Sequence, residues 1–386
     1  MRKKKICVVI GSAMNLHSLY KDQFKFLQEN GYEITGVAPD GIEHEWLQND
    51  GIRTKIIHLK RPPSPVNDLW SLLQLSWFFM FNRFDIVSIS TPKASLIGAL
   101  AASLTFQKKI MYTLRGRAYE METGWKRKFY ETIEKFVCAV SVKVFCISHE
   151  LKDDVIKSGI CKKEKIFVIG SGSSNGVDLI KFNLSLENLE QGRKVRKKLG
   201  LKREDLLILY SGRIRKDKGI NELVLAFNRI ALSRKNVFLL IQGKYDHFDS
   251  LTEEVLFLIT KHPRIFQEGW KRNTEKFYAA ADIFAFPSHR EGFGNVALEA
   301  SAMELPVIGF NVIGCRESIS HGVSGLLIDE INSTQLEIGL VELIEKPKLR
   351  KELGRKGRCR IESEFDSKIL WRELLNSYNN IIHDDN

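Results

Sequence analysis

Short apolar runs alternate with longer amphipathic stretches along the first half of the chain. The runs that are typical of buried strands cover residues 6–10, 34–38, 86–90, 110–113, 144–147 and 166–169, and helix-length segments separate most of them. This alternation predicts a doubly wound, mostly parallel sheet. In such sheets, ligands bind where the carboxyl ends of the strands open a crevice. Functional residues are therefore expected directly after the strands.

The second half continues the α/β pattern, with apolar runs at residues 206–211, 237–242, 283–286 and 307–309. A chain of 386 residues exceeds the size at which a single core usually suffices, so two domains are expected. Glycine and serine are frequent at the start of residues 170–182, where they favour a bend. We place an N-terminal domain at residues 1–172, a linker at 173–185, a C-terminal domain at 186–365 and a final amphipathic helix within 366–386.

Residues 66–82 form the most apolar stretch of the chain. As a helix this stretch is too short to span a bilayer and is apolar nearly all round, which favours a helix packed inside the domain. The neighbouring Lys55, Lys60, Arg61 and Arg83 leave open a second interpretation, in which one face of the helix rests on anionic lipid.

Composition and charge narrow the class of protein. The hydrophobic fraction of 44% is ample for two buried sheets, and there is no uninterrupted apolar run long enough for a transmembrane helix. The basic start of the chain leads directly into a strand-like run and not into a signal peptide, so we expect a cytoplasmic protein. The six cysteines show no metal-ligand spacing and are expected to be mostly buried and reduced.

The formal net charge is +12, and most of the excess lies in residues 1–170. A basic surface of this kind suits nucleic acid, an anionic membrane surface or a pyrophosphate-bearing acceptor. No recognisable nucleic-acid-binding motif accompanies the charge, so nucleic acid is the least favoured of the three partners.

The most informative stretch runs from Ser288 to Gly309 and carries two glutamates, Glu291 and Glu299, eight positions apart. Glycines follow the first glutamate, where a chain leaving a strand needs unusual backbone angles or room for a ligand. A helix is expected to begin near Asn295, so free backbone N–H groups would lie beside one carboxylate, with the second about a turn or more further on. This combination suits a ligand with phosphate and hydroxyl groups. The alternative is a simple turn with two solvated glutamates.

The sequence E-G-F-G-N-V-A-L-E resembles the E-x7-E signature of the retaining, two-domain GT-B glycosyltransferases of family 4. The resemblance implies that Glu291 contacts the donor sugar near the reacting carbon and that Glu299 binds the ribose hydroxyls of the nucleotide. It also implies that the intervening backbone cradles the diphosphate, through Gly292, Phe293, Gly294, Asn295 and Val296.

A second motif, G-R-I-R-K-D-K-G at residues 212–219, resembles the phosphate clamp of the same family. The resemblance implies that Arg213 and Lys218 neutralise the departing diphosphate, which would stabilise the transition state by fixed positive charge. A plain basic turn is the alternative. The similarity to the family covers nearly the whole chain and is tightest from residue 212 to residue 327.

The N-terminal half departs from the family pattern after the strand at 110–113. Many members have Thr-x-His-Gly there, whereas this chain has Arg115 in place of the histidine, followed by Gly116 and Arg117. The local sequence resembles a subgroup that works on lipid-linked sugars, and arginines suit the phosphates of a polyprenyl diphosphate acceptor. Gly11 and Ser12, after the first strand, are further acceptor-binding candidates. A solvated basic loop is the alternative.

Taken together, the resemblance implies an α/β protein of the GT-B fold, with two Rossmann-like doubly wound domains facing across a cleft and a C-terminal helix that crosses back to the N-terminal domain. The implied enzyme is a retaining glycosyltransferase that moves a hexose or N-acetylhexosamine from a nucleotide sugar, with UDP favoured, to a polyprenyl-diphosphate-linked acceptor. It would act at the cytoplasmic face of the membrane in bacterial cell-surface polysaccharide or glycan synthesis. No Asp-x-Asp motif is present, so neither a metal nor another cofactor is expected.

Three other functions are weighed against this one. A GT-B sugar-nucleotide epimerase shares the fold and would act on the donor alone. A nicotinamide dehydrogenase is disfavoured because the first strand is not followed by G-x-G-x-x-G. A non-catalytic protein that binds membrane or nucleic acid would account for the charge but leaves Arg213, Lys218, Glu291 and Glu299 unexplained.

Overall fold

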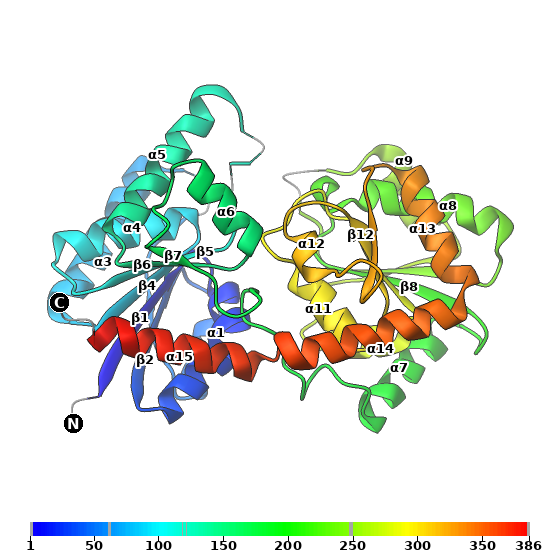
Figure 1. The fold of residues 1–386 in the computed structure, drawn as a ribbon, viewed down its shortest axis with the longest axis horizontal. Helices are drawn as coiled ribbons and strands as arrows, with labels where there is room; N and C mark the ends of the chain where they lie inside the picture. The colour runs from blue at the N-terminus through cyan, green and yellow to red at the C-terminus, as the bar shows by residue number, and fades with distance from the viewer. Residues whose placement is uncertain (1–2, 61–62, 118, 121, 247–249, 384–386) are drawn as a thin grey trace. The chain divides into compact units, whose positions relative to one another are not determined.

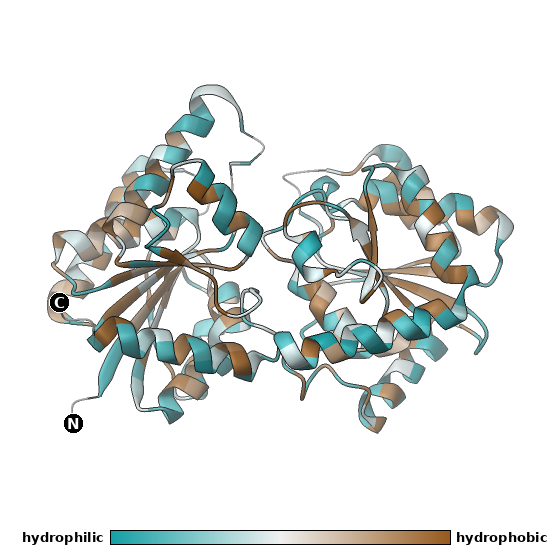
Figure 2. Ribbon diagram, viewed as in Figure 1, coloured by the Kyte–Doolittle hydropathy of each residue, from teal (hydrophilic) through white to brown (hydrophobic). Residues whose placement is uncertain are grey.

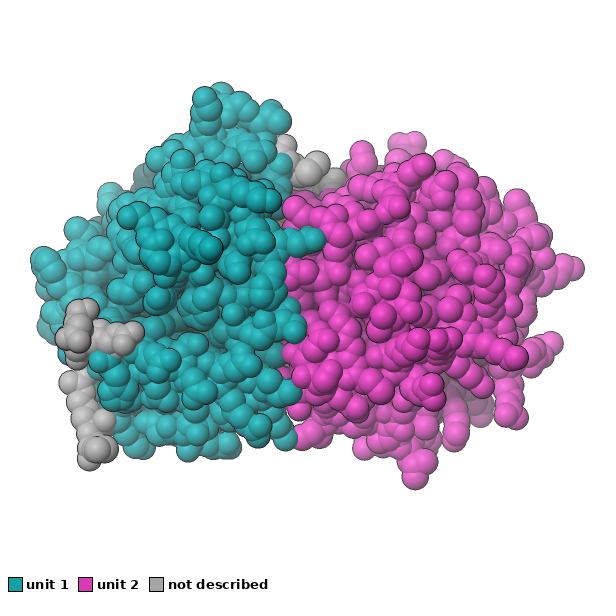
Figure 3. All heavy atoms as spheres, in the orientation of Figure 1, with its two compact units in different colours: residues 1–175, 368–386 teal, residues 176–367 magenta. Residues whose placement is uncertain are grey.

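The computed structural model describes residues 3–60, 63–117, 119–120, 122–246 and 250–383. The chain divides into two compact units: unit 1 comprises residues 1–175 and 368–386, and unit 2 comprises residues 176–367 (Figure 3). Each unit has its own sheet, and in both sheets every pairing between neighbouring strands is parallel.

The sheet of unit 1 has seven strands in the order β3-β2-β1-β4-β5-β6-β7. Their bounds are β1 (Lys4–Ile10), β2 (Tyr32–Ala38), β3 (Arg53–Ile56), β4 (Ile86–Ser90), β5 (Ile110–Leu114), β6 (Lys143–Cys146) and β7 (Ile166–Phe167). Ile10 pairs with Ser90, and Ser90 pairs with Thr113. The carboxyl ends of β1, β4 and β5 are therefore level with one another, which brings the residues that follow them to one edge of the sheet.

Helices cover both faces of this sheet (Figure 1). One face packs on α3 (Pro65–Phe81), α4 (Pro92–Leu104), α5 (Gly124–Val140) and α6 (His149–Lys157), through a core that includes Val9, Leu75, Ile89 and Val137. The remaining helices of the unit are α1 (Ala13–Glu29), α2 (Glu43–Asn49) and α15 (Ser367–His383). The strands in the middle of each sheet are mostly brown in Figure 2, as expected for strands that are buried on both faces.

Only one side of α3 is buried. Ser71, Leu75 and Phe79 face the core, whereas large apolar side chains along the rest of the helix are exposed. The prediction that residues 66–82 pack inside the domain is therefore wrong. The physical reason is the position of α3: it has α4 as its neighbour, and no other described helix covers its outer side.

The C-terminal helix α15 packs on unit 1. The Tyr32 hydroxyl donates a hydrogen bond of 2.7 Å to Asn379, and the Trp371 indole donates one of 2.7 Å to Asn175. Leu374 and Tyr378 of the same helix are almost fully buried. The chain therefore completes unit 1 with a segment that follows the whole of unit 2.

The sheet of unit 2 has six strands in the order β10-β9-β8-β11-β12-β13. Their bounds are β8 (Leu206–Ser211), β9 (Val237–Gln242), β10 (Ile265–Glu268), β11 (Ile283–Phe286), β12 (Val307–Phe310) and β13 (Gly325–Ile328). The helical segments are α7 (Leu186–Lys198), the short 3-10 helix η1 (Lys216–Lys218), α8 (Ile220–Ser233), α9 (Glu253–Lys261), α10 (Glu275–Ala280), α11 (Asn295–Ala302), α12 (Cys315–Ser318), α13 (Ser333–Glu345) and α14 (Pro347–Glu364).

The predicted fold class, two α/β domains with parallel sheets, is thus confirmed. Of the six cysteines, five are buried and Cys359 is exposed. Within the described part of the chain, every helix is too short or too polar to cross a membrane.

Candidate active site

The order of strands in unit 2 brings the two predicted donor motifs together. β8, which precedes Arg213 and Lys218, pairs directly with β11, which precedes Glu291. Because both strands run in the same direction, the residues that follow them meet at the same edge of the sheet. The basic clamp and the first glutamate, which are more than seventy residues apart in sequence, are therefore neighbours.

Lys218 and Glu291 form a direct ion pair. Lys218 Nζ lies 2.6 Å from Glu291 Oε1 and also donates to the carbonyl oxygen of Arg290 at 3.1 Å. The Ser288 hydroxyl donates to the same Glu291 oxygen at 3.1 Å. Both charged side chains are largely enclosed, with exposed fractions of 11% for Lys218 and 19% for Glu291. The enclosure holds a cation and a carboxylate in one place with little freedom to move.

Gly219 allows η1 to press against the end of β11. Its φ of 68° lies in the left-handed region, and a Cβ at this position would lie 1.8 Å from the carbonyl oxygen of Pro287. The backbone of His289 also donates to the carbonyl oxygen of Asp217 at 3.0 Å. Glycine at position 219 is therefore a condition for the contact between Lys218 and Glu291.

The turn after Glu291 leads directly into α11. Gly294, with a φ of 88°, is the N-cap residue and has no side chain with which to cap the helix. Phe293 is 1% exposed and packs on Phe365 with ring centroids 5.7 Å apart, which anchors the turn. Gly292, Asn295 and Val296 are each partly exposed. The turn thus offers its backbone, and not the Phe293 side chain, to a ligand.

Glu299 lies on α11 and has a partner that the sequence did not reveal. The hydroxyl of Tyr278, on α10, donates a hydrogen bond of 2.9 Å to Glu299 Oε2. Desolvation raises the pKa of Glu299 to about 7, and the hydrogen bond from Tyr278 acts in the opposite direction. The sequence shows a tyrosine beside apolar residues in α10, but it does not show which group accepts the hydrogen bond of the tyrosine hydroxyl. The same is true of Ser288, which precedes Glu291 by three positions.

The arginines of the basic turn have different surroundings. Arg213 has 51% of its side chain exposed, and its guanidinium lies 3.5 Å from Asp246. Arg215 is 14% exposed and lies 2.5 Å from Asp217 and 3.4 Å from Asp246. Arg213 is therefore accessible to a ligand, whereas Arg215 is held by carboxylates of the protein. Within the described residues, no group of three or more His, Cys, Asp or Glu is placed to hold a metal ion.

In unit 1, three of the four acceptor-binding candidates share one edge of the sheet. Gly11 follows β1 and donates its backbone N–H to Thr91 Oγ1 at 3.0 Å, at the end of β4. Ser12 accepts a hydrogen bond of 3.4 Å from the backbone N–H of Asn15 and so caps α1. Arg115 follows β5 and donates to Ser90 Oγ at 3.0 Å and to the Tyr20 hydroxyl at 2.8 Å.

Arg117 lies apart from this group. It is 7% exposed and forms an ion pair with Asp154 on α6. The loop that carries it is anchored by Glu134, a buried carboxylate that accepts hydrogen bonds from the hydroxyls of Tyr112, at 3.0 Å, and of Tyr119. Burial raises the pKa of Glu134. The structure thus gives Arg117 a protein partner and leaves Arg115 beside Tyr20, which sequence reasoning did not select.

Two family models match the chain. "Glycosyltransferase Family 4" matches residues 21–179, and "Glycosyl transferases group 1" matches residues 192–360. A capsular polysaccharide biosynthesis glycosyltransferase, CapM of Staphylococcus aureus, is 34% identical over 382 residues, which cover 99% of this chain and 98% of that protein. A UDP-Gal:alpha-D-GlcNAc-diphosphoundecaprenol alpha-1,3-galactosyltransferase of Escherichia coli is 26% identical and covers 89% of this chain and 88% of its own length.

Solved structures share the fold at lower identity. HepE of Anabaena, in complex with UDP and glucose, superposes with a TM-score of 0.81 at 19% identity and covers 98% of this chain and 100% of its own. A sucrose-phosphate synthase from Thermosynechococcus elongatus also has a TM-score of 0.81 at 19% identity, over 98% of this chain and 99% of its own. The predicted fold and family are confirmed: the chain has the GT-B fold and belongs to the group 1, family 4 glycosyltransferases.

Proposed function

We propose that this glycosyltransferase moves a hexose or N-acetylhexosamine from a UDP-sugar to a lipid-linked saccharide, with retention of the anomeric configuration, during the assembly of a bacterial cell-surface polysaccharide. The observation that carries the proposal is the 2.6 Å contact between Lys218 and Glu291 beside the turn into α11. In a nucleotide sugar, the reacting carbon and the leaving phosphate are joined through one oxygen. A carboxylate for the sugar and a cation for the phosphate must therefore lie this close together.

Each part of such a donor, from the ribose through the diphosphate to the sugar, has candidate binding residues in unit 2. In the proposal, Glu299 accepts hydrogen bonds from the ribose hydroxyls, and the backbone from Gly292 to Val296, at the start of α11, holds the diphosphate. Lys218 and the exposed Arg213 would neutralise the charge that develops on the departing diphosphate. Glu291 would hold the sugar while the acceptor hydroxyl attacks from the side on which the diphosphate leaves.

This arrangement supports a reaction without a metal ion. Arg213 and Lys218 bring the positive charge that a divalent cation otherwise supplies to a leaving diphosphate. We therefore propose that transfer continues in the presence of a chelator, with the leaving phosphate helping to take the proton of the acceptor hydroxyl.

The acceptor proposal rests on unit 1 and on the relatives. Arg115 lies at the edge where β1, β4 and β5 end, beside Ser12 and Gly11, and its guanidinium suits a diphosphate. The E. coli relative is named for a diphosphoundecaprenol-linked acceptor, and CapM is named for capsular polysaccharide biosynthesis. A lipid-linked acceptor would bring the enzyme to the cytoplasmic face of the membrane as a peripheral protein.

The test begins with thermal melting of the protein against UDP, GDP, ADP and their sugars, because a ligand that binds only the folded state raises the melting temperature. The UDP-sugar that raises the melting temperature most is then incubated with the enzyme, a polyprenyl-diphosphate-N-acetylglucosamine acceptor and a chelator. We expect an α-linked product from wild type and almost none from Glu291→Gln. Conversion of the donor without an acceptor would instead identify an epimerase, and stabilisation by GDP or ADP alone would overturn the assignment of UDP.

A further inference from the structure

A stripe of exposed apolar side chains runs along the whole of α3. Seven large residues of this 17-residue helix are between 53% and 82% exposed, at spacings of one, three and four positions that place them along its outer side: Val66, Leu69, Trp70, Leu73, Trp77, Met80 and Phe81. The rings of Trp77 and Phe81 lie side by side with centroids 4.9 Å apart. We call these seven residues the α3 stripe.

The turn at residues 105–107 extends the stripe at its C-terminal end. The side chain of Gln107 donates to the carbonyl oxygens of Phe79, at 2.9 Å, and Asn82, at 3.1 Å, so this turn is fixed to the last turn of α3. Phe106, at the tip of the turn, is 85% exposed. Single exposed apolar residues are ordinary, but a contiguous apolar surface about 25 Å long marks a place of interaction.

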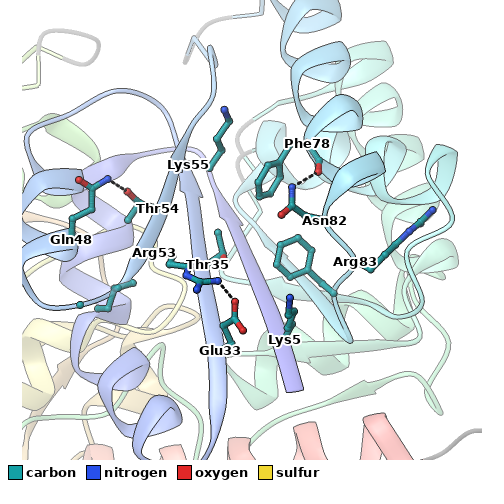
Figure 4. A pocket seen from close by; sticks show the side chains of 13 residues that line it. Lys5, Glu33, Thr35, Gln48, Arg53, Thr54, Lys55, Phe78, Asn82 and Arg83 are labelled. Carbon is teal, nitrogen blue, oxygen red and sulfur yellow. Dashed lines mark hydrogen bonds and ion pairs between the residues drawn. The ribbon is translucent and has the colours of Figure 1, made fainter. Parts of the chain in front are cut away.

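Basic residues accompany the stripe. A cavity of about 560 Å³ lies between the edge of the sheet and the C-terminal part of α3, where Phe78 and Asn82 form part of its wall (Figure 4). Its described lining residues include four cations, Lys5, Arg53, Lys55 and Arg83, and one carboxylate, Glu33, which is paired with Arg53. At the other end of the helix, Lys60 is exposed in the segment that leads into α3.

The side chains around the cavity make its rim positively charged. Arg83 donates to the carbonyl oxygen of Phe106 at 3.3 Å, which places its charge at the turn that carries the exposed Phe106 side chain. Lys55 is exposed on β3 at the edge of the sheet, and Figure 4 shows it on the opposite wall from Phe78. The cavity therefore combines a positive rim with the end of an apolar helix.

This combination selects one kind of partner. In a symmetric dimer built on the α3 stripe, each copy would meet the same surface of the other, so the cations beside the stripe would be brought together and would repel. An anionic bilayer matches both features, because its headgroups attract lysine and arginine while its interface accommodates tryptophan and other apolar rings. Tryptophan is also the residue that is most typical of this interface.

We propose that α3 and the basic cavity beside it form a surface that binds an anionic phospholipid bilayer, with the α3 stripe in the interface and the phosphate of a headgroup in the cavity of Lys5, Arg53, Lys55 and Arg83. The helix lies on the membrane and does not cross it. Asp68, in the first turn of α3, pairs with Lys93, which follows β4, so this turn lies at the edge of the sheet where Gly11, Ser12 and Arg115 follow their strands. A lipid-borne acceptor would thus reach that edge from the bound bilayer. The binding itself does not rest on the proposed transfer reaction.

The test is co-sedimentation of the whole protein with vesicles of phosphatidylcholine alone or mixed with phosphatidylglycerol, without donor or acceptor. Wild type should bind the mixed vesicles and should bind phosphatidylcholine much more weakly. Trp77→Ser with Phe81→Ser should reduce the affinity for mixed vesicles about tenfold or more, because apolar area is no longer inserted. Lys55→Gln with Lys60→Gln should reduce it several-fold at low salt and little at high salt.

Two matched controls separate the surface from general changes in polarity or charge. Leu232→Ser with Phe257→Ser removes apolar groups that are 82% and 63% exposed in unit 2. Lys162→Gln with Lys163→Gln removes two exposed charges just before β7, at the opposite edge of the same sheet from β3. Both control pairs should bind vesicles as wild type does. Melting temperature and UDP binding of every variant verify that the fold is intact.

A second readout reports insertion directly. Lipids brominated on their acyl chains should quench the fluorescence of wild type, and the quenching should fall when Trp70 and Trp77 are both replaced by phenylalanine. The proposal is overturned if wild type does not bind mixed vesicles, or if the α3 variants bind as well as wild type. It is also overturned if the α3 changes convert a dimer to a monomer without affecting vesicles, since the stripe would then join two copies. None of these results would contradict the proposed sugar transfer, which is tested by a separate assay.

Discussion

The Tyr278 hydroxyl and the Glu299 carboxylate are joined by a hydrogen bond of 2.9 Å, and burial raises the pKa of this carboxyl from 4.5 to about 7. In the proposed donor site, this carboxyl group must therefore lose its proton near neutral pH before both of its oxygens can accept hydrogen bonds from a ribose. This relationship ties nucleotide binding to pH.

We expect the affinity for UDP to fall as the pH is lowered from about 8 to about 6, with a midpoint near the pKa of Glu299. The hydrogen bond from Tyr278 lowers this pKa, so Tyr278→Phe should move the midpoint to higher pH. Calorimetric titration of UDP over this range measures the shift. Glu299→Gln should bind more weakly at pH 8 and lose most of the pH dependence; a profile that is the same in wild type and Glu299→Gln would show that another group titrates.

The same carboxyl affects stability with a definite sign. Its pKa is higher in the folded chain than in the unfolded one, so the folded state is favoured while Glu299 is protonated, and that advantage is lost as the pH rises from about 4.5 through about 7. The size of this advantage is on the order of 3 kcal/mol. Denaturant unfolding should show that Glu299→Gln is as stable as wild type at pH 5 and more stable at pH 8. Greater stability of wild type at pH 8 would contradict the assignment.

Removal of the carboxylate at position 291 should affect turnover more than binding. Glu291→Gln keeps the size of the side chain but weakens its contact with Lys218, and we expect kcat to fall about 10²- to 10³-fold, with UDP affinity changed by less than about threefold. Glu190→Gln, at an exposed position on α7, is the control and should have wild-type kinetics. Intact turnover in Glu291→Gln would remove Glu291 from the reaction.

The two arginines of the basic turn should separate activity from stability. Arg213 is half exposed, so Arg213→Ala should lower kcat by about tenfold or more without changing the free energy of unfolding. Arg215→Ala removes one ion-pair partner from each of the two enclosed carboxylates Asp217 and Asp246 and should destabilise unit 2 by about 1–3 kcal/mol. Kinetics and denaturant unfolding of both variants give the comparison, and loss of stability in Arg213→Ala would contradict it.

Gly219 and Gly200 provide a matched test of the close approach between Gly219, which follows Lys218, and the backbone of Pro287. Both have a positive φ, of 68° and 71°, but a Cβ at Gly219 would meet the carbonyl oxygen of Pro287 at 1.8 Å, whereas a Cβ at Gly200 has nothing within 4 Å. Gly200→Ala should cost about 1 kcal/mol of stability from backbone strain alone. Gly219→Ala should cost about 3 kcal/mol or more and also lower kcat, because η1 must move away from β11. Equal effects of the two substitutions would mean that the close approach is not needed.

The parts of the candidate site that could be predicted from the sequence are those whose signal is local. Glu291, Lys218 and the turn into α11 each follow a recognisable strand, and their convergence follows from the adjacency of β8 and β11. Partners contributed by other segments could not be predicted. Tyr278 reaches Glu299 from α10, and Asp154 reaches Arg117 from α6, so both depend on how helices pack on the sheet.

The misjudged helix α3 has a different cause. A helix that is apolar on every side has the same sequence pattern whether one side or all sides are covered. Leu75 and Phe79 pack in the core, while Trp70 and Trp77 are exposed. Only the number of neighbouring helices distinguishes a helix covered on one side from a helix covered on all sides. A second apolar side on a surface helix is a signal of interaction that periodicity alone does not separate from burial.

The late position of α15 in the chain has a consequence for biosynthesis. The backbone N–H of Val177 donates to the carbonyl oxygen of Phe365 at 2.8 Å, and the N–H of Ser367 donates to the carbonyl oxygen of Val177 at 3.0 Å. The two ends of unit 2 are therefore hydrogen-bonded to each other. Unit 2 can therefore fold as one continuous segment, whereas unit 1 needs a segment that is made after the whole of unit 2. Unit 1 is completed only after α15 has been synthesised, so the apolar surface that Leu374 and Tyr378 cover stays exposed until then.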